Sequence, residues 1–217
     1  MKQLIGIYGA SGFGKELLPL VREQYTEAQL CFIDDGSTLN TLNDYQVYTF
    51  QDYLALPNVT RAVVLAIADS KIREVLELKC QQSNIELLSV KASNSIVLDQ
   101  VDIGTGSVLC HFTQLTSNIK IGKQFHANIY SYVAHDCVIG DYVTFAPKVQ
   151  CNGNVHIEDH AYIGTGAIIK QGTPTKPLVI GKGAIVGMGA VVTKSVAAGV
   201  TVIGNPARPL TKEGLRK

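Results

Sequence analysis

The sequence predicts a small α/β domain with a parallel sheet, followed by a parallel β-helix. Over residues 1–90, short apolar runs alternate with segments of helical periodicity, which is typical of a parallel sheet with helices on its faces. From residue 97 onward, apolar or small residues instead recur at every sixth position, a period that belongs to the coils of a β-helix. We therefore expect two domains, residues 1–92 and residues 93–217.

The first domain is expected to begin with a strand at Leu4–Tyr8, a glycine-rich turn at Gly9–Gly14 and a helix that continues to about Tyr25. The further elements are three strands and one helix, at Leu30–Ile33, Arg61–Ile67, Lys71–Ser83 (the helix) and Glu86–Val90. In a sheet of this kind, the loops that follow the strands line up along one edge. Ligand-binding residues are therefore sought in those loops.

The hexads of the second domain place one apolar or small side chain inward in each repeat. Their positions are Val97, Ile103, Leu109, Leu115, Ile121, Ala127, Val133, Ile139, Phe145, Cys151, Ile157, Ile163, Ile169, Ile180, Val186 and Val192. The residue that follows is often Gly or Asn, and we expect it to take the positive φ of a turn. The repeat slips by five residues across Lys170–Val179, so Gln171–Pro177 is expected to be a loop that leaves one corner of the coil.

Composition excludes several classes of function. The net charge is +1, with 19 basic and 18 acidic residues well mixed, so we expect no nucleic-acid partner. No apolar run approaches the ~18 residues of a membrane span, and the first strand is too short for a signal peptide. The five cysteines form no C-x-x-C pair, which fits free thiols in a cytoplasmic protein.

The first turn, Gly9-Ala10-Ser11-Gly12-Phe13-Gly14, stands between a strand and a helix. This setting suits backbone N–H groups and a helix dipole that point at phosphates, although a tight structural turn would have the same glycines. The pattern is G-x-x-G-x-G and not the dinucleotide fingerprint G-x-G-x-x-G. Asp34 and Asp35 end the second strand, where a carboxylate meets a ribose hydroxyl or a base edge, or else caps a turn.

In the second domain, His135 and Asp136 follow the inward Val133, so they belong to a turn and point outward. A histidine at such a corner either faces solvent or acts as an acid–base group in a groove between subunits. Cys137 and Cys151 occupy inward positions of the repeat, and we expect both to be buried thiols rather than nucleophiles.

Five segments together carry a resemblance to a known family. They are Tyr8–Gly14, Phe32–Asp35, Ala66–Arg73, His135–Gly140 and Gly204–Arg208. With these segments the chain resembles the sugar O/N-acetyltransferases of the sialic-acid and bacillosamine type, over nearly its whole length. The resemblance implies that a Rossmann-like domain precedes a left-handed β-helix of hexapeptide repeats. The left hand follows from the resemblance alone, because the crossover rule favours the opposite hand.

The resemblance also implies the activity. Acetyl-CoA would donate its acetyl group to a nucleotide-linked aminosugar in bacterial glycan biosynthesis, with a UDP-linked 4-amino sugar as the first expectation. O-acetylation of a sialic-acid-like sugar is the second expectation within the same class. The family needs no metal, and it forms homotrimers with active sites between subunits.

The family's active-site residues match four positions in the β-helix. His135 matches the general base and Asp136 the acidic residue that assists it. Asn128 matches another active-site position, although Asn is also a good turn residue. Gly153 matches the residue whose backbone N–H stabilises charge on the thioester oxygen and contacts the cofactor, although a turn would also accept glycine.

Other matches concern the two substrates. Acetyl-CoA is expected at Thr144, where some relatives carry a second histidine, at Thr165 and at Met188. The nucleotide-sugar is expected at the first turn, the two aspartates and the loop after the third strand, which supply Ser11, Gly12, Phe13, Asp34, Asp35 and Ala68. Many relatives have His in place of Phe13 and Gly in place of Ala68.

Three other functions remain as alternatives. A zinc hydratase could use the same β-helix with His156 and His160, but these are four residues apart on a strand and turn, without an evident third ligand. An NAD(P) oxidoreductase would use the glycine turn, but no hydride-transfer residues accompany it. The chain could also bind sugar nucleotides without catalysis.

Overall fold

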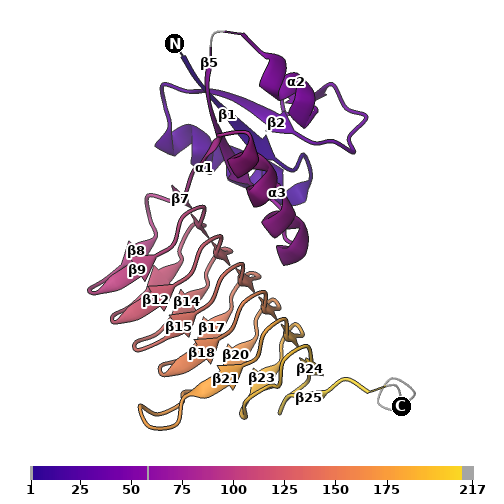
Figure 1. The fold of residues 1–217 in the computed structure, drawn as a ribbon. Helices are drawn as coiled ribbons and strands as arrows, with labels where there is room; N and C mark the ends of the chain where they lie inside the picture. Colours follow the sequence, from indigo (N-terminus) through magenta and orange to yellow (C-terminus); the bar gives the residue numbers. More distant parts are fainter. Residues whose placement is uncertain (1, 58, 212–217) are drawn as a thin grey trace. The chain divides into compact units, whose positions relative to one another are not determined.

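The computed structural model describes residues 2–57 and 59–211. The chain divides into two compact units, Met1–Lys91 and Ala92–Lys217. Figure 1 shows a sheet flanked by helices in the first unit and a stack of short strands in the second. Both parts of the predicted fold class are confirmed.

The sheet of the first unit has the strand order β3-β4-β2-β1-β5-β6. Neighbouring strands are parallel, except for the antiparallel pair β3–β4. The strands of this sheet are β1 Lys2–Tyr8, β2 Gln29–Ile33, β3 Thr41–Leu42, β4 Tyr45–Tyr48, β5 Val59–Leu65 and β6 Glu86–Leu87. A further strand, β7 Val90–Lys91, is not one of them. The helices are α1 Gly12–Gln24, α2 Phe50–Ala55 and α3 Ser70–Gln82.

The first unit differs from the expectation in three details. The predicted strand at residues 61–67 ends at Leu65, and the one predicted at residues 86–90 divides into β6 and β7. The hairpin β3–β4 and the short helix α2 were not predicted, because neither segment is long enough to show a period. Phe50 and Tyr53 of α2 are nevertheless buried, and they form part of the core.

The second unit is a left-handed parallel β-helix whose strands form three parallel sheets. Sheet I contains β8 Ile96–Val97, β11 Gln114–Leu115, β14 Tyr132–Val133, β17 Gln150–Cys151, β20 Ile168–Ile169 and β23 Val191–Val192. Sheet II contains β9 Val101–Ile103, β12 Ile119–Ile121, β15 Val138–Ile139, β18 Val155–Ile157 and β21 Leu178–Ile180. Sheet III contains β10 Val108–Leu109, β13 His126–Ala127, β16 Thr144–Phe145, β19 Tyr162–Ile163, β22 Ile185–Val186, β24 Thr201–Ile203 and β25 Arg208–Pro209, the last antiparallel to β24.

Three hexads make one coil, so each residue pairs with the residue one coil later. Val133 pairs with Cys151 and Cys151 with Ile169, all in sheet I. The predicted inward residues from Leu109 onward are buried and form one continuous core. In the first coil, Ile103 is exposed and Val97 only partly buried, because no earlier coil covers them.

The expectation that the residue after each inward residue takes a positive φ is wrong. The glycine that follows an inward residue, such as Gly122 or Gly140, has no left-handed φ. Its Cβ would instead lie 2.2 Å and 2.6 Å, respectively, from the carboxylate oxygen of Asp141 or Asp159 in the next coil. These glycines therefore allow close stacking of coils, and the positive φ falls two residues later, as at Asp136 (φ 58°).

Three corners therefore run along the β-helix, one between each pair of sheets. The His135 corner joins sheet I to sheet II, and its left-handed residues are Gln100, Asn118, Asp136 and Asn154. The Tyr142 corner joins sheet II to sheet III, with Gly106, Gln124, Tyr142, His160 and Gly183. The Thr165 corner joins sheet III to sheet I, with Phe112, Tyr130, Lys148, Gly166 and Gly189.

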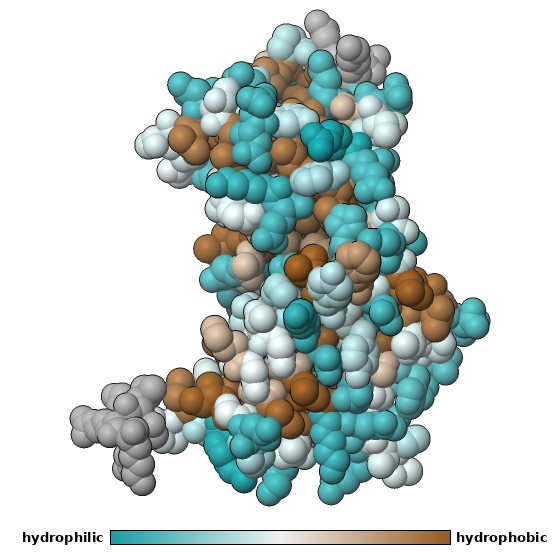
Figure 2. All heavy atoms as spheres, turned by 180° about the vertical axis from the view of Figure 1, so that it is seen from behind, coloured by the Kyte–Doolittle hydropathy of each residue, from teal (hydrophilic) through white to brown (hydrophobic). Residues whose placement is uncertain are grey.

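The surface seen in Figure 2 mixes hydrophilic and hydrophobic residues. Several outward positions of the β-helix are apolar and exposed, including Val138, Ile168, Ile185 and Met188. No helix among the described residues is long and apolar enough to cross a membrane.

Candidate active site

His135 stands on the turn between β14 and β15, with about half of its side chain exposed. Its Nδ1 lies 2.7 Å from Oδ2 of Asp136. An ionised carboxylate can only accept a hydrogen bond, so the neutral ring carries its proton on Nδ1. The unprotonated nitrogen is then Nε2, which is free to accept a proton from a reacting group.

Asp136 is held from both sides. Its other oxygen, Oδ1, accepts a hydrogen bond of 3.3 Å from Nδ2 of Asn118, one coil earlier on the same corner. The hydrogen bond from His135, with a further contribution from Asn118, holds the pKa of Asp136 below its ordinary value. The sequence did not suggest Asn118, although its place exactly one coil before Asp136 would have identified it once the coil length was known.

Gly153 lies directly beside the imidazole ring, one coil after His135. A Cβ on Gly153 would lie 2.5 Å from Cε1 and 2.6 Å from Nε2 of His135. Because the φ of Gly153 is not left-handed, the ring and not the turn geometry requires glycine here. Among the described residues, the N–H of Gly153 donates no hydrogen bond to the protein, whereas the next N–H, of Asn154, donates to the carbonyl of His135.

Cys137 and Cys151 lie behind this corner and are 1% and 0% exposed. The Sγ of Cys137 is 3.3 Å from the carbonyl oxygen of Asn152. The expectation that both thiols are buried is confirmed, and neither has the access that a nucleophile needs.

The loop at residues 171–177 is anchored to the same corner. The N–H of Gly172 donates to the carbonyl of Gly153 at 3.0 Å, and the N–H of Leu178 donates to the carbonyl of Asn154 at 3.1 Å. The predicted loop is present, and these two bonds show that it leaves the His135 corner.

The remaining expected residues of the β-helix lie elsewhere. Asn128 lies between β13 and β14, where its Oδ1 accepts from the N–H of Ile129. Thr144 is buried on β16, and Thr165 and Met188 occupy successive coils of the Thr165 corner. Asn128 and His135 therefore stand at opposite ends of β14, and one chain does not bring the expected residues together.

The two histidines of the zinc alternative do not converge. His156 is exposed on β18, whereas His160 is buried at the Tyr142 corner and stacks on Tyr142 with ring centroids 4.9 Å apart. No three His, Cys, Asp or Glu side chains gather as a metal site in the described part of the chain.

In the first unit, the glycine turn packs tightly against its surroundings at two positions. Gly9 has a φ of 119°, and a Cβ there would lie 2.8 Å from the carbonyl oxygen of Ala66. A Cβ on Gly14 would lie 2.0 Å from the carbonyl oxygen of Gly9. Gly12 has no atom within 4 Å of such a Cβ, so the space in front of it is open.

This contrast gives a first prediction. Gly12→Ala should leave the melting temperature nearly unchanged and raise the KM for the nucleotide-sugar about tenfold, because the new methyl group occupies the open approach to α1. Gly14→Ala should instead cost about 1–3 kcal/mol of unfolding free energy, since its methyl group meets the backbone. Thermal unfolding and steady-state kinetics check both variants. A large loss of stability in Gly12→Ala would contradict the prediction that Gly12 faces open space where the nucleotide-sugar approaches.

The two helices that begin at this edge differ in their first turns. The carboxylate of Asp69 caps α3 by accepting from the N–H groups of Lys71 and Ile72 at 2.8 Å and 3.1 Å. Ser11, at the N-cap of α1, makes no side-chain hydrogen bond to its helix. The first turn of α1 therefore has no side-chain cap, whereas the first turn of α3 has one.

Asp34 connects the end of β2 to the glycine turn. Its Oδ2 accepts from the N–H of Ala10 at 2.9 Å, and its Oδ1 accepts from the N–H of Gly36 at 3.0 Å. Asp34 therefore holds in place the loop that the sequence analysis assigned to substrate binding. These two contacts are those expected if Asp34 caps a turn, which was the alternative reading of this residue.

Asp35 belongs to a cluster that the sequence did not suggest. Its Oδ2 accepts from the hydroxyl of Tyr8 at 2.5 Å and from Nζ of Lys79 at 2.7 Å, while its Oδ1 accepts from the N–H of Phe50. Partial burial acts to raise the pKa of Asp35, but these hydrogen bonds outweigh it and hold the pKa below its ordinary value. Burial and the bond to Asp35 raise the pKa of Tyr8, so Tyr8 remains a donor.

The loop after β5 contains Ala68. The fully buried Arg73 donates from Nη1 to the carbonyl oxygens of Ile67 at 2.8 Å and Ala68 at 3.3 Å. Of the expected substrate residues, Ser11 and Gly12 are exposed and Phe13 is half-buried. The unit therefore brings the glycine turn, the end of β2 and the loop of Ala68 to the carboxyl ends of its strands.

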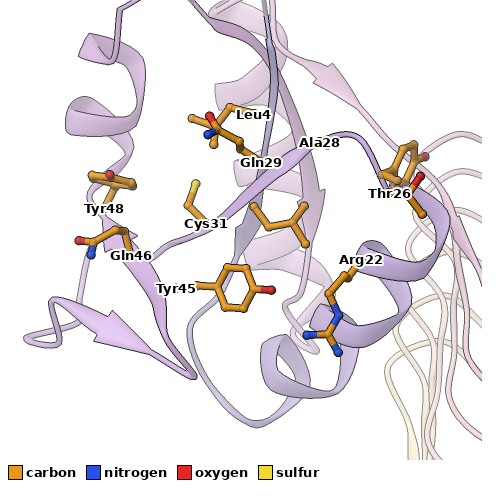
Figure 3. A pocket seen from close by; sticks show the side chains of 11 residues that line it. Leu4, Arg22, Thr26, Ala28, Gln29, Cys31, Tyr45, Gln46 and Tyr48 are labelled. Atoms are coloured by element: carbon orange, nitrogen blue, oxygen red, sulfur yellow. The ribbon is translucent and has the colours of Figure 1, made fainter.

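A cavity of about 500 Å³ in the first unit lies away from these loops. Figure 3 shows its lining side chains, among them Arg22 from α1, Gln29 from β2, and Gln46 and Tyr48 from β4. Gln29 is the first residue of β2, so the cavity reaches the amino end of that strand. Ligands of parallel sheets bind at the carboxyl ends, and this cavity is not the expected nucleotide site.

The left-handed β-helix of hexapeptide repeats and the Rossmann-like unit before it define the class of hexapeptide-repeat acyltransferases. Residues 4–77 match the family model described as the PglD N-terminal domain. The chain is 48% identical to "GDP-perosamine N-acetyltransferase" of Escherichia coli O157:H7 over 96% of its length and 97% of that protein. The chain belongs to this family of sugar N-acetyltransferases.

Solved structures agree with this result. WeeI from Acinetobacter baumannii AYE matches with 65% sequence identity and a TM-score of 0.95, over 96% of this chain and all of that one. The acetyltransferase domain of PglB from Neisseria gonorrhoeae FA1090, in complex with acetyl coenzyme A, matches with 26% identity and a TM-score of 0.87, over 97% of this chain and 100% of that chain. The protein is an acetyl-CoA-dependent sugar N-acetyltransferase.

Proposed function

We propose that the protein transfers the acetyl group of acetyl-CoA to the 4-amino group of a GDP-linked sugar of the perosamine type. The observation that carries this proposal is the His135 corner, where an oriented histidine, a carboxylate and an unpaired backbone N–H meet. The choice of GDP is supported by the relative named "GDP-perosamine N-acetyltransferase", and we prefer it here to the sequence-based expectation of a UDP-sugar.

The chemistry at this corner is base-assisted aminolysis of a thioester. The sugar amine attacks the carbonyl carbon of acetyl-CoA while Nε2 of His135 takes the amine proton. Negative charge develops on the former carbonyl oxygen, and the N–H of Gly153 stabilises it. The C–S bond then breaks, and the imidazolium of His135 returns the proton to the departing CoA sulfur. Asp136 remains ionised throughout and stabilises the imidazolium.

The glycine turn of the first unit would hold the pyrophosphate of the sugar nucleotide. The uncapped start of α1 and the open space at Gly12 support this role. Ser11, Phe13 and Ala68 lie on the loops at the same edge. Asp34 holds the glycine turn through the N–H of Ala10, and Asp35 holds the start of α2 through the N–H of Phe50.

The complete active site would form between copies of the chain in a homotrimer. His135, Asp136 and Gly153 belong to one corner of the β-helix, whereas Asn128, Thr165 and Met188 belong to another. A cyclic assembly brings the His135 corner of one copy to the Thr165 corner of the next. Thr144 of sheet III would then contact acetyl-CoA from the side of the second copy.

A panel of acceptors tests this proposal. The purified protein is incubated with acetyl-CoA and with GDP-perosamine, matched UDP- and dTDP-linked 4-amino sugars, or a CMP-linked sialic-acid-like sugar, and thiol release is followed. We expect the highest kcat/KM with GDP-perosamine and an N-acetylated product. A higher value with a UDP-sugar would overturn the nucleotide assignment, and an O-acetylated product would overturn the assignment of the amine as nucleophile.

A further inference from the structure

We propose that Phe112 and Tyr130 of one copy bind the C6 methyl group of the acceptor sugar whose amine is acetylated at His135 of the neighbouring copy. This inference rests on the proposed function and on the homotrimer proposed with it. It names the residues by which the enzyme distinguishes a 4-amino-4,6-dideoxy sugar, such as perosamine, from the same sugar with a hydroxyl group at C6.

Phe112 and Tyr130 form an exposed aromatic pair on successive coils of the Thr165 corner. Their rings stack with centroids 4.8 Å apart and an angle of 5° between the ring planes. The two residues are 46% and 52% exposed, respectively. About half of the surface of each residue is therefore open to a ligand.

The fold does not require aromatic residues at these two positions. Phe112 and Tyr130 have left-handed φ values of 61° and 60°, which bulky side chains rarely adopt. On later coils the same corner has Gly166 and Gly189, with φ values of 69° and 66°. Because glycine serves this turn at least as well, two bulky and exposed rings here indicate a role other than folding.

Hydrogen bonds of the backbone hold the two rings in place. The N–H of Phe112 donates to Oδ1 of Asn94 at 3.2 Å, and the N–H of Tyr130 donates to the carbonyl oxygen of His111 at 3.2 Å. The stacked pair is therefore a preformed apolar surface, and aromatic side chains of this kind commonly line the sites of small ligands.

The pair lies on the coils that the acceptor sugar would occupy. Tyr130 precedes β14 and His135 follows it, whereas Phe112 lies one coil earlier. Gly153, whose N–H stabilises the thioester oxygen in the proposed mechanism, lies one coil later than His135. The thioester is then on the side of the later coils, and the sugar that attacks it comes from the side of the earlier coils.

The proposed homotrimer brings the pair to the catalytic histidine of the next copy. The Thr165 corner of one copy runs beside the His135 corner of the next when the rotation axis is parallel to the β-helix. Equivalent coils then lie at equal heights, so Tyr130 of one copy is level with His135 of the next. Asn128, which matches an active-site position of the family, lies only two residues before Tyr130.

An aromatic pair suits the methyl group of a 6-deoxy sugar. Burial of a methyl group against apolar rings is favourable, whereas a hydroxyl group in the same place loses its hydrogen bonds to water. Apolar sites distinguish substrates that differ by one such group by about 10–100-fold. The pair should therefore set a preference of this size between acceptor sugars.

The test compares two acceptors that differ only at C6, GDP-perosamine and GDP-4-amino-4-deoxymannose. For the original protein we expect kcat/KM to be about 10–100-fold higher with GDP-perosamine. In Phe112→Ala/Tyr130→Ala this preference should fall to about threefold or less, with the KM for acetyl-CoA unchanged. Tyr130→Phe keeps the ring and should keep the preference.

Ile185→Ala is the matched control. It removes an exposed apolar side chain from β22 of sheet III and should leave the preference unchanged. Light scattering measures the mass of each variant in solution, and the double variant should retain the mass of the original protein. If the double variant dissociates, the pair is a contact between copies and the proposal is wrong; an unchanged preference in an intact double variant also refutes it.

The proposal can fail separately from the proposed function. Calorimetric titration of both sugar nucleotides in the presence of CoA makes the same comparison without turnover. If the double variant keeps the preference of the original protein, the assignment of the pair is wrong while acetyl transfer at His135 stands. If the preference in binding depends on the pair but neither acceptor is acetylated, the proposed function fails while the assignment of the pair stands.

Discussion

Replacing His135 with alanine should lower kcat by about 10²–10⁴-fold, which is the usual contribution of a positioned general base. The ring is half-exposed and its hydrogen bond is to the equally exposed Asp136, so the melting temperature should be unchanged within a degree or two. Binding of the sugar nucleotide should also be unchanged. Steady-state kinetics and calorimetric titration with the sugar nucleotide measure the two effects separately.

Two further variants make this result specific. His156→Ala removes an exposed histidine from β18 and should leave kcat unchanged. Asp136→Asn should lower kcat at least about tenfold, because an amide no longer fixes the proton on Nδ1 of His135. If His135→Ala retains its full rate, another group is the base and the proposed mechanism is wrong.

Gly153→Ala should lower kcat by about 10²-fold without unfolding the β-helix. The added methyl group would lie within 2.6 Å of Nε2, so the imidazole must turn away from its place beside Asp136. Since the ring is a half-exposed side chain on a turn, it can move, and the damage should fall on activity rather than on stability. Kinetics with saturating acetyl-CoA and a thermal melt check this prediction.

Gly183→Ala is the comparison for that variant. Gly183 lies on the Tyr142 corner with a φ of 65° and has no atom within 4 Å of an added Cβ. Alanine there should cost about 1–2 kcal/mol of stability through backbone strain and leave kcat intact. If Gly153→Ala behaves in the same way, Gly153 is only a turn glycine and has no part in the active site.

The hexad period was sufficient to predict the β-helix because every repeat places one side chain in the same core. Val133, Cys151 and Ile169 are each readable from the sequence as inward residues, and the structure pairs them in one sheet. The same period predicted the loop at residues 171–177, because the loop interrupts it. Local repetition of this kind needs no knowledge of distant contacts.

Contacts between coils could not be predicted in the same way. The hydrogen bond from Asn118 to Asp136 depends on how many hexads make one coil, and no single repeat contains that number. The role of Gly153 also depends on it, since the ring that requires glycine belongs to the previous coil. The sequence showed that glycines recur, but it did not show which of them serve close packing.

The first unit shows a second limit. The glycine turn and the strands β1, β2 and β5 were predicted from local patterns, but the bond between Asp35 and Lys79 joins residues 44 positions apart. No period or motif links them, and the pair appears only when α3 packs on the sheet. Asp34 was singled out from the sequence as a substrate-binding residue, but its backbone contacts with Ala10 and Gly36 became visible only in the structure.

Complementation between two inactive chains tests most directly whether the active site forms between copies of the chain. His135→Ala lacks the base on one corner of the β-helix, and Asn128→Ala lacks a residue at the other end of β14. After each is shown to be inactive alone, both are co-expressed and purified as mixed oligomers. The mixture should regain activity, because some sites pair an intact His135 with an intact Asn128 from a neighbouring chain. If the mixed oligomers remain as inactive as the single variants, the active site does not form between copies of the chain.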